Sequence, residues 1–391
     1  MRWLRIGSGV FLFILSAISL WESIVPAYRF QEPSPFSGEK WYNPFAGDTL
    51  KWQRANFHIH SKNRLGITPG YQDVPTILRV YDSLGFQCIG ISDYQCINPR
   101  SPIPLYEHGW NIGKVHQLCF WAKEVKWIDF PLLQTLSTKQ FMIEFLRPTS
   151  SFLVLAHPRF LHSYTGDELK YLGGYDAIEC LNRYGDSIAE WDSALSAGHY
   201  APILAHDNVH DVYNPHQIAS RWTEIAIMDG RNKDALKEAL LAGRTVGYKN
   251  RTPFPITSSY PLFRQIQMRG NTLFVQVSQK VDTLRVVGQG GRVRAWACST
   301  DSLSYEVTPG DTYLRVEAYT PNVEAYTSPL VRGGPKRRPI PPRDVLLTFI
   351  RRGFFILVGV ALLFLSFFLL RLFPSKGAIL PQDKPPSPPL E

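Results

Sequence analysis

The sequence predicts an α/β protein: a distorted (β/α) barrel with seven strands, then a small antiparallel β domain, with a transmembrane helix near each end of the chain. Three observations support this prediction. Strand-like runs alternate with helix-like segments between residues 50 and 250, short alternating runs follow from residue 261, and long apolar stretches lie near both termini. Alternation of strands with helices is typical of a parallel sheet wrapped by helices.

The predicted barrel occupies residues 50–250. Its seven strand-like runs are apolar and lie at residues 57–60, 88–92, 116–121, 152–156, 177–181, 202–205 and 224–228. Helix-like segments lie between them at residues 74–84, 138–146, 187–197 and 233–241. Gly85 and Gly243 follow the first and last of these segments, where glycine commonly ends a helix.

The pattern of apolar and polar residues changes after the predicted barrel. Short alternating runs at residues 272–277, 283–287, 293–297 and 313–319 are separated by Gly, Asp and Pro turns, which predicts a small β domain over residues 261–332. A basic, proline-rich linker follows at 333–352, and the proline-rich tail at 372–391 has the composition of a disordered segment.

Two apolar stretches favour attachment to a membrane bilayer. The first, within residues 1–25, follows Arg2 and Arg5; it lacks a small-x-small cleavage site, so an uncleaved anchor is favoured over a signal peptide. The second, residues 353–371, is long enough to span a bilayer. Arg2 and Arg5 place the soluble body on the periplasmic or extracytoplasmic side, whereas the basic residues before the second stretch favour the opposite side. We follow the first helix, which usually dominates orientation.

Charge and cysteine content narrow the classes of function. The net charge of +9 comes largely from one cluster near the second apolar stretch, and no basic stripe with interleaved aromatics marks a nucleic-acid surface. We therefore expect no nucleic-acid partner. The five cysteines form no CxxC pair, and buried thiols are the simplest interpretation of most of them.

Polar residues of metal-binding type gather at or just beyond the ends of the predicted strands. They are His58, His60, Asp93, His157, Glu179, His206, Asp207 and His210. Barrels of this class carry their active sites at the C-terminal ends of the strands. This repeated placement predicts a metal site more strongly than any one of these residues.

His58 and His60 form a His-x-His pair, which projects both imidazoles to the same side of a strand because side chains alternate. Glu107 and His116 add a carboxylate able to bridge two ions and a further imidazole. Four other histidines are better interpreted as surface or packing residues: His108, His162, His199 and His216.

The order of these motifs resembles the polymerase and histidinol phosphatase (PHP) family over about residues 53–250. The motifs are His-x-His, Ser-Asp-Tyr, Glu followed by His, Ala-His-Pro and Asp-Asn-x-His. The resemblance implies a distorted, TIM-like barrel that binds two or three divalent metal ions and hydrolyses phosphoesters. It implies a first ion held by His58, His60 and Glu107, and a second held by Glu107, His116 and His157.

The chain departs from the family pattern at three places. Residues 62–66, after His-x-His, contain no acid or histidine, Tyr94 follows Asp93 where the family usually has histidine, and Asn208 stands where it has a ligating aspartate. We therefore expect two ions, with Asn208 as a weak neutral ligand of the first unless Asp207 replaces it. His210 is left over from the family's third site, and a site of this kind suits Zn, Mn or Fe.

These residues favour a metal-dependent phosphoesterase acting on a phosphorylated substrate whose identity the sequence does not give. Asp207 or His210 could manage the proton, and Arg159 could hold a phosphate oxygen. The alternative is a degenerate member of the family that binds metal or ligand without catalysis, as a membrane-associated sensor or scaffold. The enzyme is favoured over this alternative, because a purely structural barrel would have no reason to keep five costly polar groups around one end.

Overall fold

The computed structural model describes residues 2–47, 50–63, 70–132, 134–228, 232–252 and 259–371. The chain divides into two compact units. One is residues 28–342, which contain all the sheet structure, and the other is formed by the terminal segments on either side of it.

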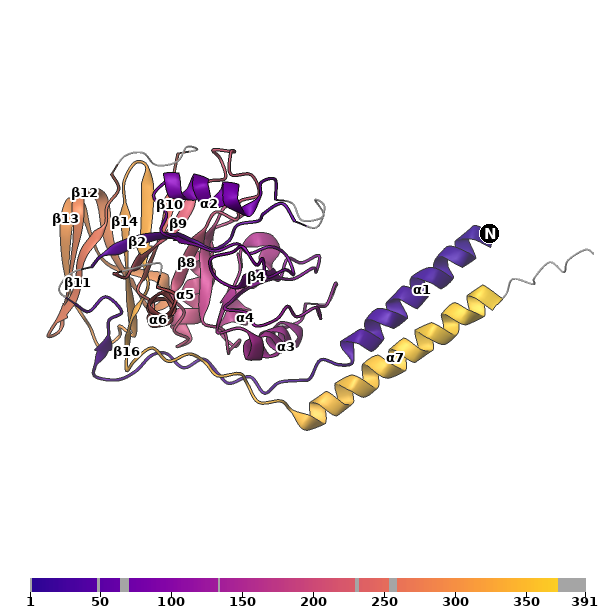
Figure 1. The fold of residues 1–391 in the computed structure, drawn as a ribbon. Coiled ribbons are helices and arrows are strands. Elements are labelled where there is room, and N and C mark those ends of the chain that lie inside the picture. Colours follow the sequence, from indigo (N-terminus) through magenta and orange to yellow (C-terminus); the bar gives the residue numbers. More distant parts are fainter. Residues whose placement is uncertain are drawn as a thin grey trace, which may run out of the picture. The chain divides into compact units, whose positions relative to one another are not determined.

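The larger sheet has eleven strands and curls into a half-barrel (Figure 1). Along its main path lie β1 (Trp41–Tyr42), β16 (Leu330–Arg332), β14 (Tyr313–Tyr319), β15 (Val323–Thr327), β10 (Thr245–Asn250), β9 (Arg221–Ala226), β2 (Trp52–Asn56) and β3 (Cys88–Ile89). Three long strands branch from it, β11 (Phe263–Arg269), β12 (Thr272–Gly288) and β13 (Arg292–Glu306). Only the β2–β3 pair is parallel in this sheet.

The smaller sheet has five strands in the order β4 (Leu105–His108), β5 (Gln117–Phe120), β6 (Phe152–Leu155), β7 (Ala177–Asn182) and β8 (Ile203–His206). Every residue of these strands is buried, which explains their nearly continuous apolar sequence. Isolated bridges join Ile59 to Val209 and Tyr94 to Glu107, so the loops that carry the polar residues meet where the two sheets approach.

The four predicted helices of the body are present close to their expected positions. They are α2 (Val74–Ser83), α3 (Leu136–Leu146), α5 (Ile188–Ser196) and α6 (Lys233–Ala242), with one further short helix, α4 (Gly166–Leu169). Local signals fix their ends. Asp73 caps α2 by accepting a hydrogen bond from the backbone of Thr76, and Gly243 ends α6 in the left-handed conformation (φ 77°) that glycine adopts without strain.

The predicted seven-stranded (β/α) barrel is wrong. The residues described by the structure form two sheets with few helices, and strand β5 runs antiparallel to both β4 and β6. Only eight residues separate β4 from β5, which is too short for a helical crossover and sufficient for an antiparallel turn. The first predicted run, 57–60, lies just beyond strand β2 and forms only the bridge at Ile59.

The antiparallel strands expected after residue 261 are present, but they continue the larger sheet instead of forming a second one. β15 pairs with β10 from Val246↔Thr327 to Asn250↔Val323, and β14 pairs with both β12 and β15. A single buried apolar cluster also joins Ile59 and Tyr248 to Leu284. The small β domain is therefore continuous with the sheet that carries β2.

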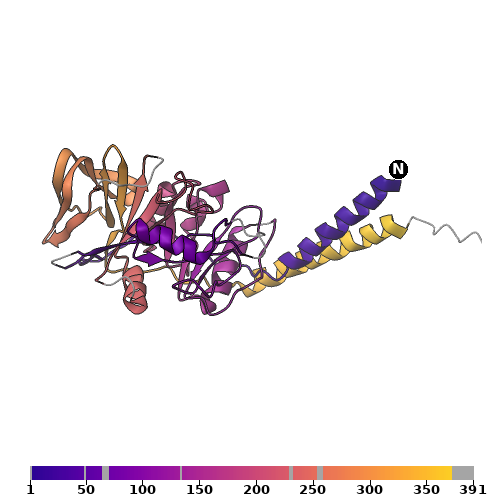
Figure 2. The same ribbon diagram turned by 45° about the horizontal axis from the view of Figure 1, so that its top comes forward.

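The terminal unit contains two helices, α1 (Arg2–Glu22) and α7 (Val345–Arg371), which are long and apolar enough to cross a membrane. Figures 1 and 2 show them side by side. They are antiparallel: the Ser16 hydroxyl donates to the Gly359 carbonyl and the Ser366 hydroxyl donates to the Gly9 carbonyl, each at 2.7 Å. Such hydrogen bonds between small residues are typical of helices packed in a bilayer. The expected disordered tail, 372–391, lies outside the described residues.

Candidate metal centre

The carboxylate of Glu107 lies at the centre of a buried group of four imidazoles. His58 and His60 follow β2, Glu107 is in β4, His116 directly precedes β5, and His157 follows β6. The isolated bridge between Tyr94 and Glu107 holds β4 against the loop that follows β3. All five side chains are at most 1% exposed. Four chain segments thus deliver their polar side chains to one point.

The two oxygens of Glu107 face different pairs of histidines. Oε2 lies 3.2 Å from Nε2 of His58 and 3.2 Å from Nε2 of His60. Oε1 lies 2.6 Å from Nδ1 of His116 and 3.2 Å from Nε2 of His157. The structure therefore brings together both predicted ligand sets, and within each set the ligand atoms lie within 4.8 Å of one another.

The charges of this group suit a divalent cation. Burial opposes protonation of His58, but Glu179 and Glu107 outweigh it and raise the pKa of His58 to about 10. Burial likewise opposes ionisation of Glu107, yet His58 and His116 hold the pKa of Glu107 well below its usual range. The ionised carboxylate therefore requires nearby positive charge, which His58 supplies only by taking up a proton.

Unsatisfied polar atoms point to the same conclusion. Within the described part of the chain, Nε2 of His58, Nε2 of His60 and Oε2 of Glu107, which face one another, are buried without a hydrogen-bond partner. Buried polar atoms are rarely left unpaired, and histidine nitrogens and carboxylate oxygens are common ligands of divalent transition metals. The residues present thus fit a metal centre.

A second buried carboxylate, Glu179 in β7, supports the cluster from one side. Its Oε1 lies 2.9 Å from Nδ1 of His58 and 3.0 Å from Nδ1 of His206, and its Oε2 accepts a hydrogen bond from the backbone of His157 at 2.9 Å. These three residues could themselves hold an ion, since His58, Glu179 and His206 form a third close group. The sequence had marked Glu179 and His206 only as polar residues near strand ends.

Asn208 and His210 lie at the edge of the cluster, where they face a cleft. Asn208 adopts a left-handed backbone (φ 49°), and its Oδ1 is buried without a hydrogen-bond partner in the described residues. The ring of His210 stacks on that of His60 with 4.5 Å between centroids, and Tyr94 stacks on His60 at the same distance. His157 is also left-handed (φ 33°), and strained residues of this kind cluster at functional sites.

Asp207 does not join the cluster. Its carboxylate accepts hydrogen bonds from the Tyr81 hydroxyl, from the Ser220 hydroxyl and from the backbone N–H groups of residues 219, 220 and 221. With its oxygens engaged in this way, Asp207 serves as a buried anchor for the chain entering β9. It does not replace Asn208 beside the first ligand set.

Arg159 is also engaged elsewhere, because its guanidinium donates to Glu190 at 2.9 Å. His108 and His199 are buried and bonded to carbonyl groups, at Ile128 and Tyr175 respectively, as expected for packing histidines. Of the segment 62–66 after His-x-His, residues 64–66 lie outside the described residues. Asp93 is not a ligand either; it accepts hydrogen bonds from the backbone and hydroxyl of Ser61.

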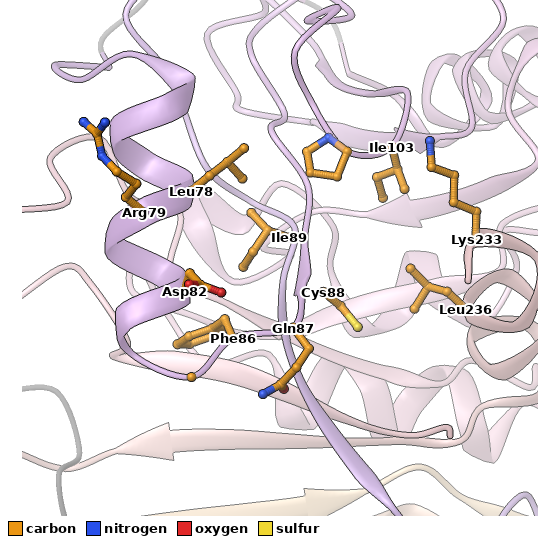
Figure 3. A pocket seen from close by; sticks show the side chains of 12 residues that line it. Leu78, Arg79, Asp82, Phe86, Gln87, Cys88, Ile89, Ile103, Lys233 and Leu236 are labelled. Carbon is orange, nitrogen blue, oxygen red and sulfur yellow. The ribbon is translucent and has the colours of Figure 1, made fainter. Parts of the chain in front are cut away.

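A cleft of about 1000 Å³ opens beside the cluster. Its lining includes His157, Asn208 and His210 from the centre, together with Tyr71, Tyr94, Gln95, Gly109, Trp110, Lys114, Trp127, Phe160, Arg183, Tyr184 and Gln217. A second cavity, of about 560 Å³, lies between α2, β3 and α6 (Figure 3). Its lining includes Leu78, Cys88 and Lys233 but none of the clustered histidines or glutamates. Of these two cavities, the first gives a ligand access to the metal centre.

The chain was also compared with known proteins. No family model, no curated protein and no solved structure matches it.

Proposed function

We propose that this chain is a metal-dependent phosphoesterase in which Glu107 and the four histidines around it would hold two divalent ions. The observation that carries the proposal is the pairing of each Glu107 oxygen with a separate pair of imidazoles at 2.6–3.2 Å. His58, His60 and Glu107 would hold one ion, and Glu107, His116 and His157 the other. One shared carboxylate between two sets of neutral ligands is a common design for paired ions.

Two divalent ions here would supply a strong nucleophile from water at neutral pH and would stabilise the charge that develops at phosphorus. Imidazole and carboxylate ligands suit Zn, Mn or Fe. Glu179 would hold His58 in the correct tautomer and orientation by accepting a hydrogen bond from Nδ1–H, which leaves Nε2 directed at the centre.

His210 is the remaining candidate for orienting the attacking water. Burial, together with the nearby His60 and Arg183, lowers the pKa of His210 to about 2, so its ring is neutral at pH 7. A neutral ring can accept a hydrogen bond from the attacking water and orient it. Asn208 would act as a neutral contact through its unpaired Oδ1, on the side of the cleft.

We infer that the chain resembles the PHP family in the order of its metal-binding motifs and not in its fold. Three of the motifs that carry the likeness supply Glu107 and the four histidines around it, whereas the barrel expected with them is not the fold of the described residues. The function is therefore argued from the centre itself.

Hydrolysis by the full-length protein, purified in detergent and loaded with Zn, Mn or Fe in turn, tests this proposal. We expect metal-dependent release of phosphate from at least one class in a panel of phosphomonoesters and phosphodiesters, and loss of that activity in Glu107→Gln. Activity that survives both a chelator and Glu107→Gln would overturn the proposal.

A second candidate function is metal or ligand binding without turnover. Asp207 favours it, because this carboxylate is held away from the centre and the first ligand set keeps only the shared charge of Glu107. The same panel separates the two functions. A protein that binds two ions and a phosphonate ligand, yet hydrolyses no phosphoester, is a binding protein of this second kind.

We also propose that the body lies outside the cytoplasm, on the strength of Arg2 and Arg5 at the start of α1. Cys298 offers a direct test, because it is the exposed cysteine, while Cys88, Cys119 and Cys180 are buried. A membrane-impermeant maleimide should label intact cells that carry the wild type but not those that carry Cys298→Ser. Labelling of Cys298 only after the cells are permeabilised would place the body inside.

A further inference from the structure

The cleft beside the metal centre carries positive charge that no carboxylate balances. Lys114 and Arg183 are the lysine and arginine of its lining, which contains no Asp or Glu. Among the described residues, neither cation has a carboxylate oxygen within 4.0 Å. By contrast, Arg159 is paired with Glu190 and Arg221 with Asp186. The two cleft cations are therefore available to an anionic ligand.

Arg183 is held in place by stacking. Its guanidinium carbon lies 4.5 Å from the centre of the Tyr184 ring, and its Nη2 donates a hydrogen bond to the Tyr184 hydroxyl. The Tyr184 ring in turn stacks on Phe160 at 4.5 Å, and Phe160 packs against the ring of His157 at 5.5 Å. A continuous wall of rings thus runs from the metal centre to the guanidinium.

Trp110 and Trp127 form a second aromatic surface of the cleft. Their side chains are 50% and 59% exposed, although the chain beneath them is fixed: the Trp110 indole donates to the Trp127 carbonyl at 3.1 Å and the Trp110 amide to Asp129 at 2.7 Å. Gly109 lies so close to the centre that a Cβ there would be 2.3 Å from the His116 ring. Exposed indoles on a fixed backbone, next to a site, are a means of binding a flat ring.

We propose that the preferred substrate is an anionic phosphoester whose organic part carries a ring, with Arg183 and Lys114 binding anionic oxygens and Trp110 and Tyr184 contacting the ring. This inference rests on the proposed phosphoesterase function and adds the class of substrate. The cleft volume of about 1000 Å³ is far larger than a phosphate alone requires and accommodates a ligand with one or more rings.

Three phosphonates that are not hydrolysed and differ in one group test the proposal: phenyl-, cyclohexyl- and methylphosphonate. Their dissociation constants are measured by calorimetry on the metal-loaded full chain in detergent, with protein-free micelles as the blank. We expect phenylphosphonate to bind roughly 2- to 10-fold more tightly than methylphosphonate, the usual gain from a ring contact. Tight binding of cyclohexylphosphonate as well would indicate a saturated ring such as a sugar, and its absence would indicate an aromatic ring.

Substitutions of the cleft residues separate the contribution of charge to phosphonate binding from the contribution of stacking. Trp110→Ala should remove the preference for a ring, whereas Trp296→Ala, a change of an exposed indole in β13, should leave it intact. Arg183→Gln and Lys114→Gln should each weaken all three phosphonates at least about tenfold, and Arg183→Lys should restore part of the loss. Arg244→Gln, which removes an arginine paired with Glu238 outside the cleft lining, is the matched control.

Two results distinguish failure of this inference from failure of the proposed function. Equal affinity for all three phosphonates in the wild type overturns the ring-bearing substrate, and a ring preference that survives Trp110→Ala overturns the role of Trp110; in both cases the phosphoesterase stands. If no phosphonate binds the metal-loaded chain, the phosphoesterase and the substrate class fall together.

Discussion

Two buried carboxylates, Glu107 and Asp207, differ in what surrounds them. Both are 0% exposed, and both lie at or next to the ends of strands in the smaller sheet. Asp207 is surrounded by hydroxyl and backbone N–H donors that come from α2 and from the start of β9. Glu107 is surrounded by imidazoles, several of which keep a buried nitrogen without a hydrogen-bond partner in the described structure.

The surroundings of these two side chains distinguish a structural carboxylate from a metal ligand. Burial raises the pKa of Asp207, and neutral donors such as the Arg221 backbone and the Tyr81 hydroxyl oppose that effect. At Glu107 burial acts in the same direction, but the charge of His58 outweighs it and lowers the pKa. The hydrogen-bond donors of the chain thus satisfy the carboxylate of Asp207, whereas the carboxylate of Glu107 depends on a positive charge that an ion can supply.

The largest expected effect is at Glu107. Glu107→Gln keeps the shape of the side chain but removes the charge shared by both ligand sets, so both ions should be lost and hydrolysis should fall by more than about 100-fold. Elemental analysis and phosphate release, measured on the same preparation, check this. Glu190→Gln, a change of a buried carboxylate that pairs with Arg159, is the control. Full metal content in Glu107→Gln would show that the carboxylate is not the shared ligand.

Asp207→Asn should reduce stability without a specific effect on metal. The amide nitrogen would face donors that now bind a carboxylate oxygen, which costs about 2–4 kcal/mol in the free energy of unfolding. Thermal unfolding in detergent should show a lower midpoint, while the folded protein keeps its ions. Asp186→Asn is the control, since its partly exposed pairs with Arg221 and Lys249 contribute much less. Loss of ions from folded Asp207→Asn would place this residue at the centre.

Glu179→Gln should weaken metal binding and leave the fold largely unchanged. The neutral amide no longer fixes the proton on Nδ1 of His58 and His206, and changes of this kind alter affinity by roughly 10–100-fold. Titration of the apoprotein with metal measures this shift, and a variant with unchanged affinity would reduce Glu179 to a packing residue.

Asn208→Asp should tighten metal binding, because it restores a negative charge beside the first ligand set. We expect a gain of up to about tenfold, and a lower metal concentration for half-maximal activity. The same titration on Asp207→Ala sharpens the comparison: the engaged Asp207 should not influence affinity. If Asn208→Asp binds no better than the wild type, its side chain does not face the ion.

The smallest expected effect concerns Arg159, which the sequence suggested as a phosphate contact. Since Arg159 is paired with Glu190, Arg159→Gln should change KM less than about threefold, as is usual for an exposed ion pair. Steady-state kinetics beside Arg183→Gln give the contrast. A larger increase in KM for Arg159→Gln than for Arg183→Gln would restore the original assignment.

The local features of the fold could be predicted from the sequence, and the direction of its strands could not. Helix α2 was visible as a helix-like segment ended by Gly85, a signal that lies within a few residues. Whether β5 runs parallel or antiparallel to its neighbours depends on pairing between distant segments, and apolar runs look alike in both cases. Strand β4 is only four residues long and gave no strand signal.

The candidate metal centre was likewise predictable only in part from the sequence. His58 and His60 alternate with Ile59, which packs in the core, so their shared direction followed from strand geometry. Alternation also explains the misplacement of Asp207: His206 faces Glu179, and the next side chain therefore points away from the centre. The role of Glu179 had no local signal, because its partners come from β2, β6 and β8.

The most direct test of the central claim is a crystal structure of the metal-soaked full chain, with anomalous scattering recorded at the absorption edge of the ion. We predict two anomalous peaks beside the Glu107 carboxylate, one next to His58 and His60 and the other next to His116 and His157. A single peak among His58, Glu179 and His206, or no peak near Glu107 at a saturating metal concentration, would contradict this prediction.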